Sequence, residues 1–479
     1  MKVKYCLLIV LINYSASIAW VNPITKSPSP WSPSSWRDKV AKQQPKYEDK
    51  ENLKNVEKEL STYAPLIFAG ECRELQKQLG QVSVGNGFLL MGGECAESIN
   101  EINTEKLRNT FCVMLQMSLI LTYGGSVPIT KLYRGAGQYA KPRSNDLEEI
   151  NGVSLPSYRG DIINNFEFTE ESRKHKPKNM INAYHHATQI INILRAFSTG
   201  GYADFDRVHQ WNLDFIKNSG VGFKYSELAT KVSDAIKFIK AIGVDVNSPF
   251  FRQTSIYTAH ECLLLPFEQA MTRKDSTTNK WYDCSGVLLW IGERTRELDG
   301  AHIEFIRGIN NPIGIKISDK CDKDELINLL EIVNPSNEPG KVVIIVRMGA
   351  IKLAEKLPIL IDEVKKLNKN VIWCCDPVHG NTVTTPDGIK TRSFESIKDE
   401  INVFFDVHKQ MGTHPGGIHL EMTGEDVTEC IGGMQNITTE DLKKNYLSQC
   451  DPRLNGFQSL ELAFLIAEKM SSHKNDLKI

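Results

Sequence analysis

Four side chains that can ligate a metal ion stand beside β-rich segments or just before the last helical stretch of the chain. They are a thiol, an imidazole and two carboxylates, at Cys95, His379, Glu421 and Asp451. A mixed set of sulfur, nitrogen and oxygen donors suits Mn²⁺, Co²⁺, Fe²⁺ or Zn²⁺. Taken singly, a buried cysteine is usually a packing residue and a loop aspartate usually forms a turn or cap. The four residues therefore predict a metal site only where the fold brings them together.

A second set of side chains is basic and lies at or within other β-rich segments: Arg134, Arg294, Lys316 and Arg347. A charge inside an apolar strand is unfavourable unless it is paired or reaches a ligand. Guanidinium groups also match phosphate and carboxylate geometry. This set predicts a pocket for a small phosphorylated acid, with salt bridges to Glu293 and Glu304 as the alternative. Lys141 and Ser144, in the segment KPRS, can reach a second phosphorylated substrate.

Eight short β-rich runs, separated for the most part by amphipathic helical stretches, must position these residues. The runs cover residues 86–91, 126–134, 250–257, 286–292, 312–317, 341–347, 370–376 and 416–421. Alternating strands and helices indicate a parallel sheet, and eight of them indicate an α/β fold of the (β/α)₈ TIM barrel type. An open doubly wound sheet is the alternative. The interval 135–249 predicts a helical insertion after strand 2.

A closed barrel would bring the two sets of side chains to one opening. Active sites of such barrels lie on the loops that follow the strands. Strands seven, eight and one become neighbours when the sheet closes, so the thiol, imidazole and carboxylates converge there. The cations then face them across the opening.

The part of the chain before the barrel reads as three segments. Lys2 and Lys4 precede a short apolar run and then small residues up to Ala19, which indicates a signal peptide at 1–19. Residues 20–36 are rich in Ser, Pro and Trp and resemble a transit-like leader. Residues 37–80 predict an N-terminal helical arm, and 81–472 the catalytic barrel. A two-part leader predicts delivery to a plastid, with the secretory pathway and the cytoplasm as alternatives.

The composition excludes several classes of protein. The chain has 479 residues, of which 41% are hydrophobic and 24% charged, which is average for globular proteins and excludes disorder and a multi-span membrane protein. A net charge of −1 predicts no nucleic-acid partner and no stable membrane association. The 11 cysteines form no C-x-x-C pair, and the chain has no P-loop, dinucleotide fingerprint or nucleophile elbow.

Long blocks of sequence surround the residues singled out above. They include MGGECAES at 91–98, AGQYAKPRS at 136–144, WIGERTRELDGAHIEFIRGINNPIGIKIS at 290–318, CDPVHGNT at 375–382 and GTHPGGIHLEMTGEDVTECIGG at 412–433. With these blocks the chain closely resembles class II, plant-type 3-deoxy-D-arabino-heptulosonate 7-phosphate (DAHP) synthase from about residue 36 to about residue 470. The resemblance implies a transferase that joins phosphoenolpyruvate to erythrose 4-phosphate, the first step of the shikimate pathway to chorismate and the aromatic amino acids.

The resemblance also implies roles for individual residues. Cys95, His379, Glu421 and Asp451 fall where the family binds its divalent metal, with Mn²⁺ expected first. Arg134, Glu293, Arg294, Lys316 and Arg347 fall where it holds phosphoenolpyruvate, with Glu293 and Lys316 as the catalytic residues. Lys141 and Ser144 correspond to the part that receives the sugar phosphate.

Further expectations follow from the same likeness. We expect a homo-oligomer, and an aromatic amino acid is the candidate effector. Cys450 precedes Asp451, so its sulfur is expected near that of Cys95, where oxidation would join the two and expel the metal. Another metal-dependent 2-oxo-acid aldolase and a catalytically silent regulatory barrel remain as alternative functions.

Overall fold

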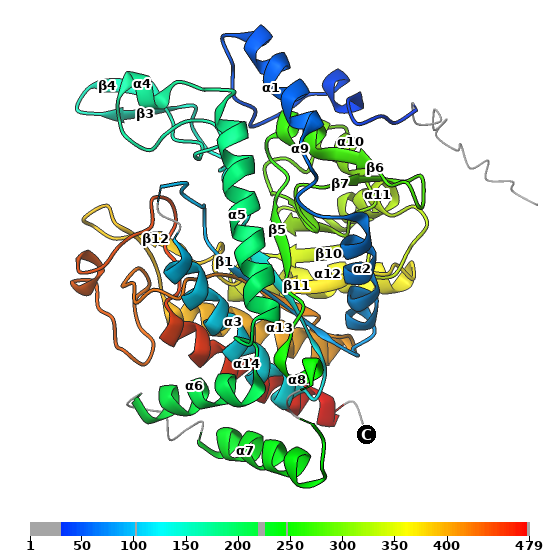
Figure 1. Ribbon diagram of the computed structural model, residues 1–479, viewed down its shortest axis with the longest axis vertical. Coiled ribbons are helices and arrows are strands. Elements are labelled where there is room, and N and C mark those ends of the chain that lie inside the picture. Colours follow the sequence, from blue (N-terminus) through cyan, green and yellow to red (C-terminus); the bar gives the residue numbers. More distant parts are fainter. Residues whose placement is uncertain (1–29, 101–102, 219–225, 246–247, 477–479) are drawn as a thin grey trace, which may run out of the picture. The chain divides into compact units, whose positions relative to one another are not determined.

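A computed structural model of the chain describes residues 30–100, 103–218, 226–245 and 248–476 (Figure 1). The chain divides into residues 1–32 and a compact unit from Pro33 to Ile479. The expected signal peptide, and the expected leader up to residue 29, lie outside the described residues. The compact unit begins with a 3₁₀ turn, Ser35–Asp38, whose Trp36 is buried and donates a hydrogen bond from Nε1 to Gln269 Oε1 at 2.9 Å.

Eight parallel strands form a closed barrel, which confirms the predicted TIM barrel. In barrel order they are β1 (Phe88–Gly93), β14 (Gly417–Glu421), β11 (Ile372–Cys375), β10 (Val342–Val346), β9 (Ile313–Ile317), β8 (Leu288–Ile291), β5 (Tyr257–Glu261) and β2 (Ile129–Arg134). Most strand residues are fully buried because side chains fill the interior and helices cover the outside. The open sheet is thereby excluded.

The third barrel strand lies further along the chain than the sequence indicated. The expected strand at 250–257 is wrong, because Pro249–Arg252 form a helical turn, α8, and the strand is Tyr257–Glu261. Proline lacks a backbone N–H and has a fixed φ, so it suits the first turn of a helix. The true strand contains His260 and Glu261, whose polarity hides it from a search for apolar runs.

The predicted insertion after strand 2 is present and is mostly helical. It contains α4 (Glu170–Arg173), α5 (Asn179–Thr199), α6 (Phe205–Asn218), α7 (Ser226–Ala241) and α8. It also contains a β-hairpin of β3 (Leu147–Ile150) and β4 (Val153–Pro156), which the sequence analysis did not predict. The hairpin turns at Asn151 and Gly152, both with positive φ (52° and 78°), a conformation that Asn-Gly adopts readily. In Figure 1 α5 crosses in front of the strands and the hairpin lies at the upper left.

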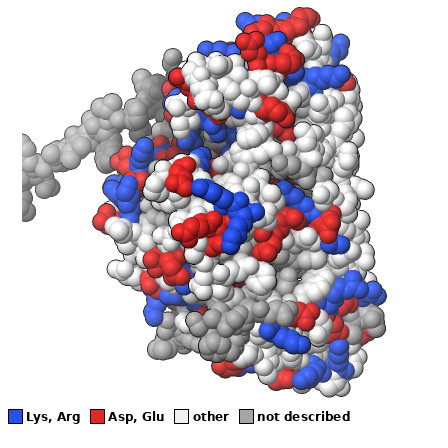
Figure 2. Space-filling model, turned by 90° about the vertical axis from the view of Figure 1, so that its left-hand side faces the viewer, with Lys and Arg blue, Asp and Glu red and all other residues white. Residues whose placement is uncertain are grey.

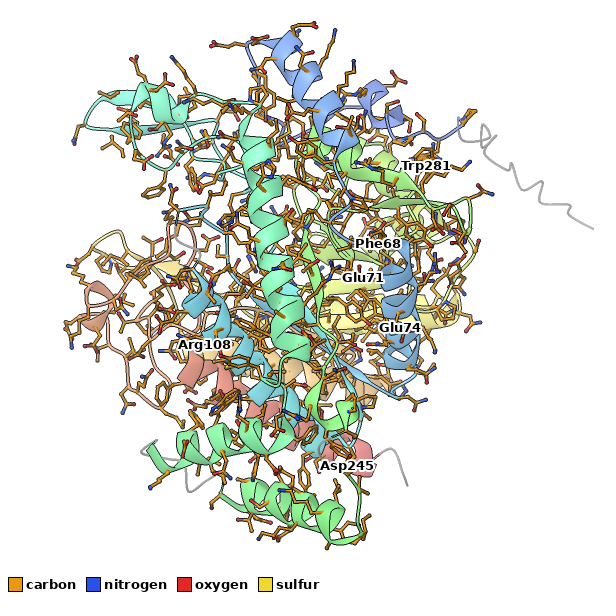
Figure 3. All side chains as sticks on the ribbon, in the orientation of Figure 1. Phe68, Glu71, Glu74, Arg108, Asp245 and Trp281 are labelled. Carbon is orange, nitrogen blue, oxygen red and sulfur yellow. The ribbon has the colours of Figure 1, made fainter. Side chains whose placement is uncertain are left out.

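Two N-terminal helices flank the barrel. They are α1 (Lys50–Thr62) and α2 (Ala69–Ser83). Helix α2 lies against the segments that lead into β1 and β10, because a Cβ on Gly80 or Gly340 would contact Pro339 or Gln76 respectively. Glu71 of α2, which is labelled in Figure 3, pairs with Arg195 of α5 at 3.0 Å. Helix α2 therefore lies at the amino end of the barrel, away from the loops that follow the strands.

The remaining helices surround the strands. They are α3 (Thr104–Gly125), α9 (Leu265–Met271), α10 (Ala301–Ile306), α11 (Lys323–Val333), α12 (Ala350–Lys366), α13 (Phe394–Met411) and α14 (Gly456–Asp476). Three of them begin at side-chain caps, Asn103, Asp322 and Ser393, each accepting a bond from the backbone three residues on. Two short strand pairs, β6 (Thr272–Lys274) with β7 (Trp281–Asp283) and β12 (Thr382–Thr384) with β13 (Lys390–Arg392), complete the fold. Within the described ranges, no helix has the length and apolarity needed to cross a membrane.

Candidate active site

A cavity of about 260 Å³ opens at the carboxyl ends of the strands. It is lined by all seven residues expected to bind substrate, Arg134, Lys141, Ser144, Glu293, Arg294, Lys316 and Arg347, together with His379 and Asp451. Figure 2 faces the side on which β3, β4 and β12 lie and shows basic and acidic side chains interspersed around its middle. The residues come from seven separate segments of the chain, so only the closed barrel brings them together.

The four expected metal ligands lie together at this opening. One donor atom each from Cys95, Glu421 and Asp451 lies within 4.8 Å of the other two. His379 Nε2 lies 3.0 Å from Glu421 Oε1. Glu421 ends β14, Cys95 follows β1 and His379 follows β11, and these three strands are neighbours in the barrel. The arrangement supplies one sulfur, one nitrogen and two carboxylate donors.

Asp451 reaches the opening by a different route. It precedes α14, and the segment that carries it returns to the end of β14 through a bridge between Met422 and Leu454. Arg453 anchors this segment through two ion pairs. It pairs with Glu94, the residue before Cys95, at 2.6 Å, and with Glu429 at 2.7 Å. All three of these side chains are buried, so the position of Asp451 is set by a buried ion-pair network.

Glu421 is held ionised although it is fully buried. Its Oε1 accepts from Arg134 Nη2 at 2.7 Å and its Oε2 from Arg392 Nη2 at 2.8 Å. Burial alone would raise the pKa of Glu421, but His379, Arg134 and Arg392 hold it well below the ordinary value. A carboxylate that keeps its charge in the interior is a suitable cation ligand.

The donor set fits a divalent cation. Lys141 places its ammonium 2.8 Å from Cys95 Sγ and 3.0 Å from Asp451 Oδ2, so positive charge is stabilised between these two donors. Burial opposes the charge on Lys141, yet Asp451, Cys95 and Glu421 raise its pKa well above the ordinary value.

The ring of His379 is held by a carboxylate behind it. Asp376 accepts from His379 Nδ1 at 2.9 Å, which leaves Nε2 facing Glu421. A carboxylate behind a histidine is the usual support for a metal-binding imidazole.

The cations on the other side of the cavity differ in how fully protein groups engage them. Arg294 donates to Ser144 Oγ at 3.1 Å, and Arg347 donates to the carbonyl of His379 at 2.9 Å. Lys316 Nζ lies 2.8 Å from Asp376 Oδ2. Burial lowers the pKa of Lys316, while Asp376 opposes that change. These three cations line the cavity, where an anion can reach them.

The alternative interpretation of the cations, as partners of Glu293 and Glu304, is wrong. Glu293 pairs with Arg296 at 2.9 Å and accepts from the backbone and hydroxyl of Ser318. Glu304 pairs with Arg307 at 2.5 Å. Each carboxylate thus forms its ion pair with an arginine three residues further along the chain, and this leaves the cavity cations to other partners.

Two of the expected substrate residues have partners that suggest other tasks. Arg134 is 2% exposed and donates to the carbonyls of Glu94 and Cys95 as well as to Glu421. Its guanidinium is thus engaged by protein groups around Cys95 and Glu421. Lys141 lies at Cys95 and Asp451 rather than beside Ser144, and so belongs to the donor group.

Sequence reasoning missed several residues of this site. Glu261, at the end of β5, lines the cavity, and its buried Oε1 has no hydrogen-bond partner within the described part of the chain. Placing the strand correctly would have put Glu261 at a strand end. Lys390, which contacts Asp451 Oδ1 at 3.1 Å, and Arg392 come from β13, and no local pattern marked them. Asp376 directly follows β11 and could have been found by its position.

A closed parallel barrel that gathers sulfur, nitrogen and carboxylate donors beside basic side chains at the carboxyl ends of its strands has the arrangement of a TIM-barrel enzyme. The model of the class-II DAHP synthetase family matches residues 31–467. The chain belongs to the class-II DAHP synthetase family. The expected activity is thereby confirmed: the enzyme is a transferase that condenses phosphoenolpyruvate with erythrose 4-phosphate to DAHP, the first step of the shikimate pathway.

Individual relatives agree with this assignment. A phospho-2-dehydro-3-deoxyheptonate aldolase of Streptomyces coelicolor is 48% identical over 440 residues, covering 92% of this chain and 97% of that protein. A probable chloroplastic phospho-2-dehydro-3-deoxyheptonate aldolase of Catharanthus roseus is 43% identical over 446 residues, covering 92% of this chain and 84% of that protein. A solved DAHP synthase of Thermotoga maritima aligns at 14% identity with a TM-score of 0.35, over 82% of this chain and 70% of that one, and adds no argument.

Proposed function

We propose that the cavity holds phosphoenolpyruvate on Arg294, Lys316 and Arg347 and presents it to the aldehyde of erythrose 4-phosphate beside the donor group of Cys95, His379, Glu421 and Asp451. The observation that carries this proposal is the close approach of the two sets, with Lys316 Nζ 3.4 Å from His379 Nδ1. Both substrates are anions that repel each other, so several cations in one cavity are needed to bring them together.

The same cavity offers a place for the sugar phosphate. Ser144 Oγ accepts from Arg294, and Arg143 lines the cavity beside Ser144, where it pairs with Glu148. Ser144, Arg143 and Arg294 would therefore bind the phosphate of erythrose 4-phosphate at the outer rim. Lys141, placed between Cys95 and Asp451, would orient the aldehyde end instead.

The donor group would hold a divalent metal, with Mn²⁺ as the first choice among Mn²⁺, Co²⁺, Fe²⁺ and Zn²⁺. Bound there, the metal supplies Lewis-acid polarisation of the aldehyde oxygen. Arg134 and Arg392 keep Glu421 ionised and in place, and Asp376 orients the ring of His379. These second-layer contacts support the metal assignment because they pre-form the site before the ion arrives.

The reaction forms a bond from carbon 3 of phosphoenolpyruvate to carbon 1 of the aldehyde, after which water adds at carbon 2 and phosphate leaves. Lys316 would neutralise the leaving phosphate. Glu293 contacts Arg296 and Ser318, so it would act by fixing this wall and not by moving a proton. Glu261, with a buried unpartnered oxygen at the cavity, is the better candidate for orienting the water.

Phosphate release from phosphoenolpyruvate tests this assignment. We expect release only when erythrose 4-phosphate is present, loss of release after chelation, and recovery with Mn²⁺. Arg347→Ala should raise the KM for phosphoenolpyruvate roughly 30-fold or more, because one partner of a charge pair is removed, and should leave the metal content unchanged. Unchanged kinetics of Arg347→Ala would reject its role, and release that survives chelation would reject the metal site.

The remaining proposals concern the localisation, the oligomeric state and the effector of the protein. The chloroplastic relative in Catharanthus roseus supports localisation to a plastid. We propose that residues 1–19 and 20–36 form the two-part leader, ahead of an arm at 37–80 and a catalytic barrel at 81–472. A homo-oligomer and an aromatic amino acid effector complete the proposal. Import of a fusion of residues 1–36 to a fluorescent protein tests the leader, and fluorescence confined to the secretory pathway would reject the plastid.

A redox control of the metal site is a separate part of the proposal. The side chain of Cys450 interacts with that of Cys95. Loss of two electrons and two protons from this pair to dioxygen would form a disulfide and remove the sulfur donor. Mass spectrometry of metal-free, air-oxidised protein should detect a Cys95–Cys450 bridge, and Cys450→Ser protein should resist inactivation by air. Absence of the bridge would exclude the switch.

A further inference from the structure

A buried carboxylate on α13 connects two loops of the active site without lining the cavity. Glu400 Oε1 accepts from the backbone N–H groups of Met348 and Gly349, each at 2.9 Å. Its Oε2 accepts from Asn381 Nδ2 at 2.8 Å. Met348 and Gly349 follow Arg347 directly, and Asn381 stands two residues after His379. One side chain therefore ties the loop of a substrate cation to the loop of a metal donor.

The two loops are in direct contact beside this carboxylate. Arg347 Nη2 donates to the carbonyl of His379 at 2.9 Å. A Cβ on Gly380 would lie 2.7 Å from the backbone nitrogen of Gly349, so the backbones pass too closely for any side chain. The separation between Arg347 and His379 is thus fixed by backbone contacts, and Glu400 holds these from outside.

The carboxylate also suits the charge at this point. Gly349 is the N-cap of α12 and, as glycine, offers no side-chain cap. The N–H groups at the start of a helix carry partial positive charge and favour an anion. Burial raises the pKa of Glu400 to about 7, while the amides of Met348 and Gly349 and the Asn381 side chain oppose a larger rise. An uncharged side chain of the same size cannot reproduce all of these contacts.

We propose that Glu400 is a positioning residue that keeps Arg347 and His379 at a fixed separation, so that substrate binding and metal binding depend on one side chain outside the cavity. The proposal rests on the roles proposed above for Arg347 and His379. It predicts a coupled defect: a change at Glu400 weakens both ligands, whereas a change at a cavity residue weakens the ligand that this residue touches.

Two variants of the full-length enzyme separate positioning from general damage. Glu400→Ala removes all three hydrogen bonds, and Glu400→Gln keeps the size of the side chain. Whichever way the glutamine amide is turned, its NH₂ group faces an N–H donor, either that of Asn381 or those of Met348 and Gly349. Glu395→Gln is the matched control because Glu395 is exposed on the same helix, where it pairs with Lys398 at 2.9 Å.

The measurements are the Mn²⁺ dissociation constant, from electron paramagnetic resonance of free Mn²⁺ without substrate, and the KM for phosphoenolpyruvate at saturating Mn²⁺, both at pH 8. For Glu400→Ala we expect both constants to rise roughly 10- to 100-fold, with a smaller rise of both for Glu400→Gln. Glu395→Gln should stay within about twofold of the wild type. Thermal unfolding confirms that each variant is folded, and Glu400→Gln decides the matter where Glu400→Ala does not fold.

The outcomes distinguish this inference from the proposed function. Arg347→Ala should raise the KM alone and leave the Mn²⁺ constant unchanged. If Arg347→Ala has no effect on the KM, the assignment of the cavity fails. If Arg347→Ala behaves as expected but the Glu400 variants only lower the unfolding temperature, with both constants unchanged, Glu400 is a structural residue and the inference is overturned.

Discussion

Two of the buried clusters of ionisable side chains in this barrel shift the pKa values of their carboxyl groups in opposite directions. At the carboxyl end, Glu421 is buried between Arg134 and Arg392 and stays ionised, with its pKa well below the ordinary value. Behind β5, Glu268 is equally buried against His260 and Ser285, and burial raises its pKa to about 7. The same burial thus gives opposite results.

The difference comes from the partners. Among the residues that the structure describes, no guanidinium or ammonium group pairs with the cluster behind β5. Burial lowers the pKa of His260, and the pKa of Asp283 beside Glu268 is raised well above its ordinary value. Such a cluster is stable only when its acids hold protons. The cluster at the opening holds fixed negative charges in place, which is the state a metal site needs. In these two clusters, the direction of the carboxyl pKa shift therefore follows from whether a guanidinium group lies against the buried carboxyl group.

Removing a cation from the opening should have the largest effect. Arg134→Met leaves Glu421 with one guanidinium fewer in the interior, and breaking a buried pair lowers the unfolding free energy by about 3–5 kcal/mol. Phosphate release should be lost together with Mn²⁺ affinity. Urea unfolding measures the stability. Arg73→Met is the control, because Arg73 pairs with Asp275 at the surface and its loss should matter by less than about 1 kcal/mol. Equal effects of the two changes would contradict the comparison.

The cluster behind β5 should respond to pH. Because the pKa of Glu268 is about 7 in the folded chain against 4.5 ordinarily, the folded state keeps a proton that the unfolded state releases. The unfolding free energy should therefore fall as pH rises from about 4.5 to about 7, by at most about 3 kcal/mol from this group. Glu268→Gln should flatten this dependence between pH 5 and pH 8, and Glu395→Gln should not. A pH dependence that is unchanged in Glu268→Gln would show that Glu268 is ionised when folded.

The smallest effect is expected at the rim of the opening. Lys390 is about half exposed and contacts Asp451 Oδ1 at 3.1 Å. Water screens such a pair, so Lys390→Gln should alter Mn²⁺ affinity by no more than about fivefold. Manganese titration monitored by electron paramagnetic resonance measures this. A loss as large as that of Arg134→Met would mean that Lys390 belongs to the buried cluster.

Much of the barrel was predictable from the sequence because buried parallel strands are short apolar runs. Seven of the expected runs contain the observed strands to within a few residues, for example 341–347 for Val342–Val346. The prediction of the third strand failed because His260 and Glu261 make the true strand polar. The apolar stretch before it directly follows Pro249, which starts a helical turn. The hairpin was missed although Asn151-Gly152 is a standard turn signal.

The candidate site was predictable only in part, for a physical reason. Cys95, His379 and Glu421 stand at strand ends, so the closed barrel places them together. Arg392 and Lys390 reach the donors from a strand pair that folds back over the opening, and Glu400 acts from the side of α13 that faces the loops. These contacts depend on tertiary packing, and no spacing in the sequence encodes them.

A crystal of the enzyme with Mn²⁺ and phosphoenolpyruvate, measured at the manganese absorption edge, tests the central claim most directly. The account predicts one anomalous peak enclosed by Cys95, His379, Glu421 and Asp451, with the phosphate of phosphoenolpyruvate on Arg294, Lys316 and Arg347 in the same cavity. A manganese peak outside this donor group, or phosphoenolpyruvate bound on another face of the barrel, would contradict it.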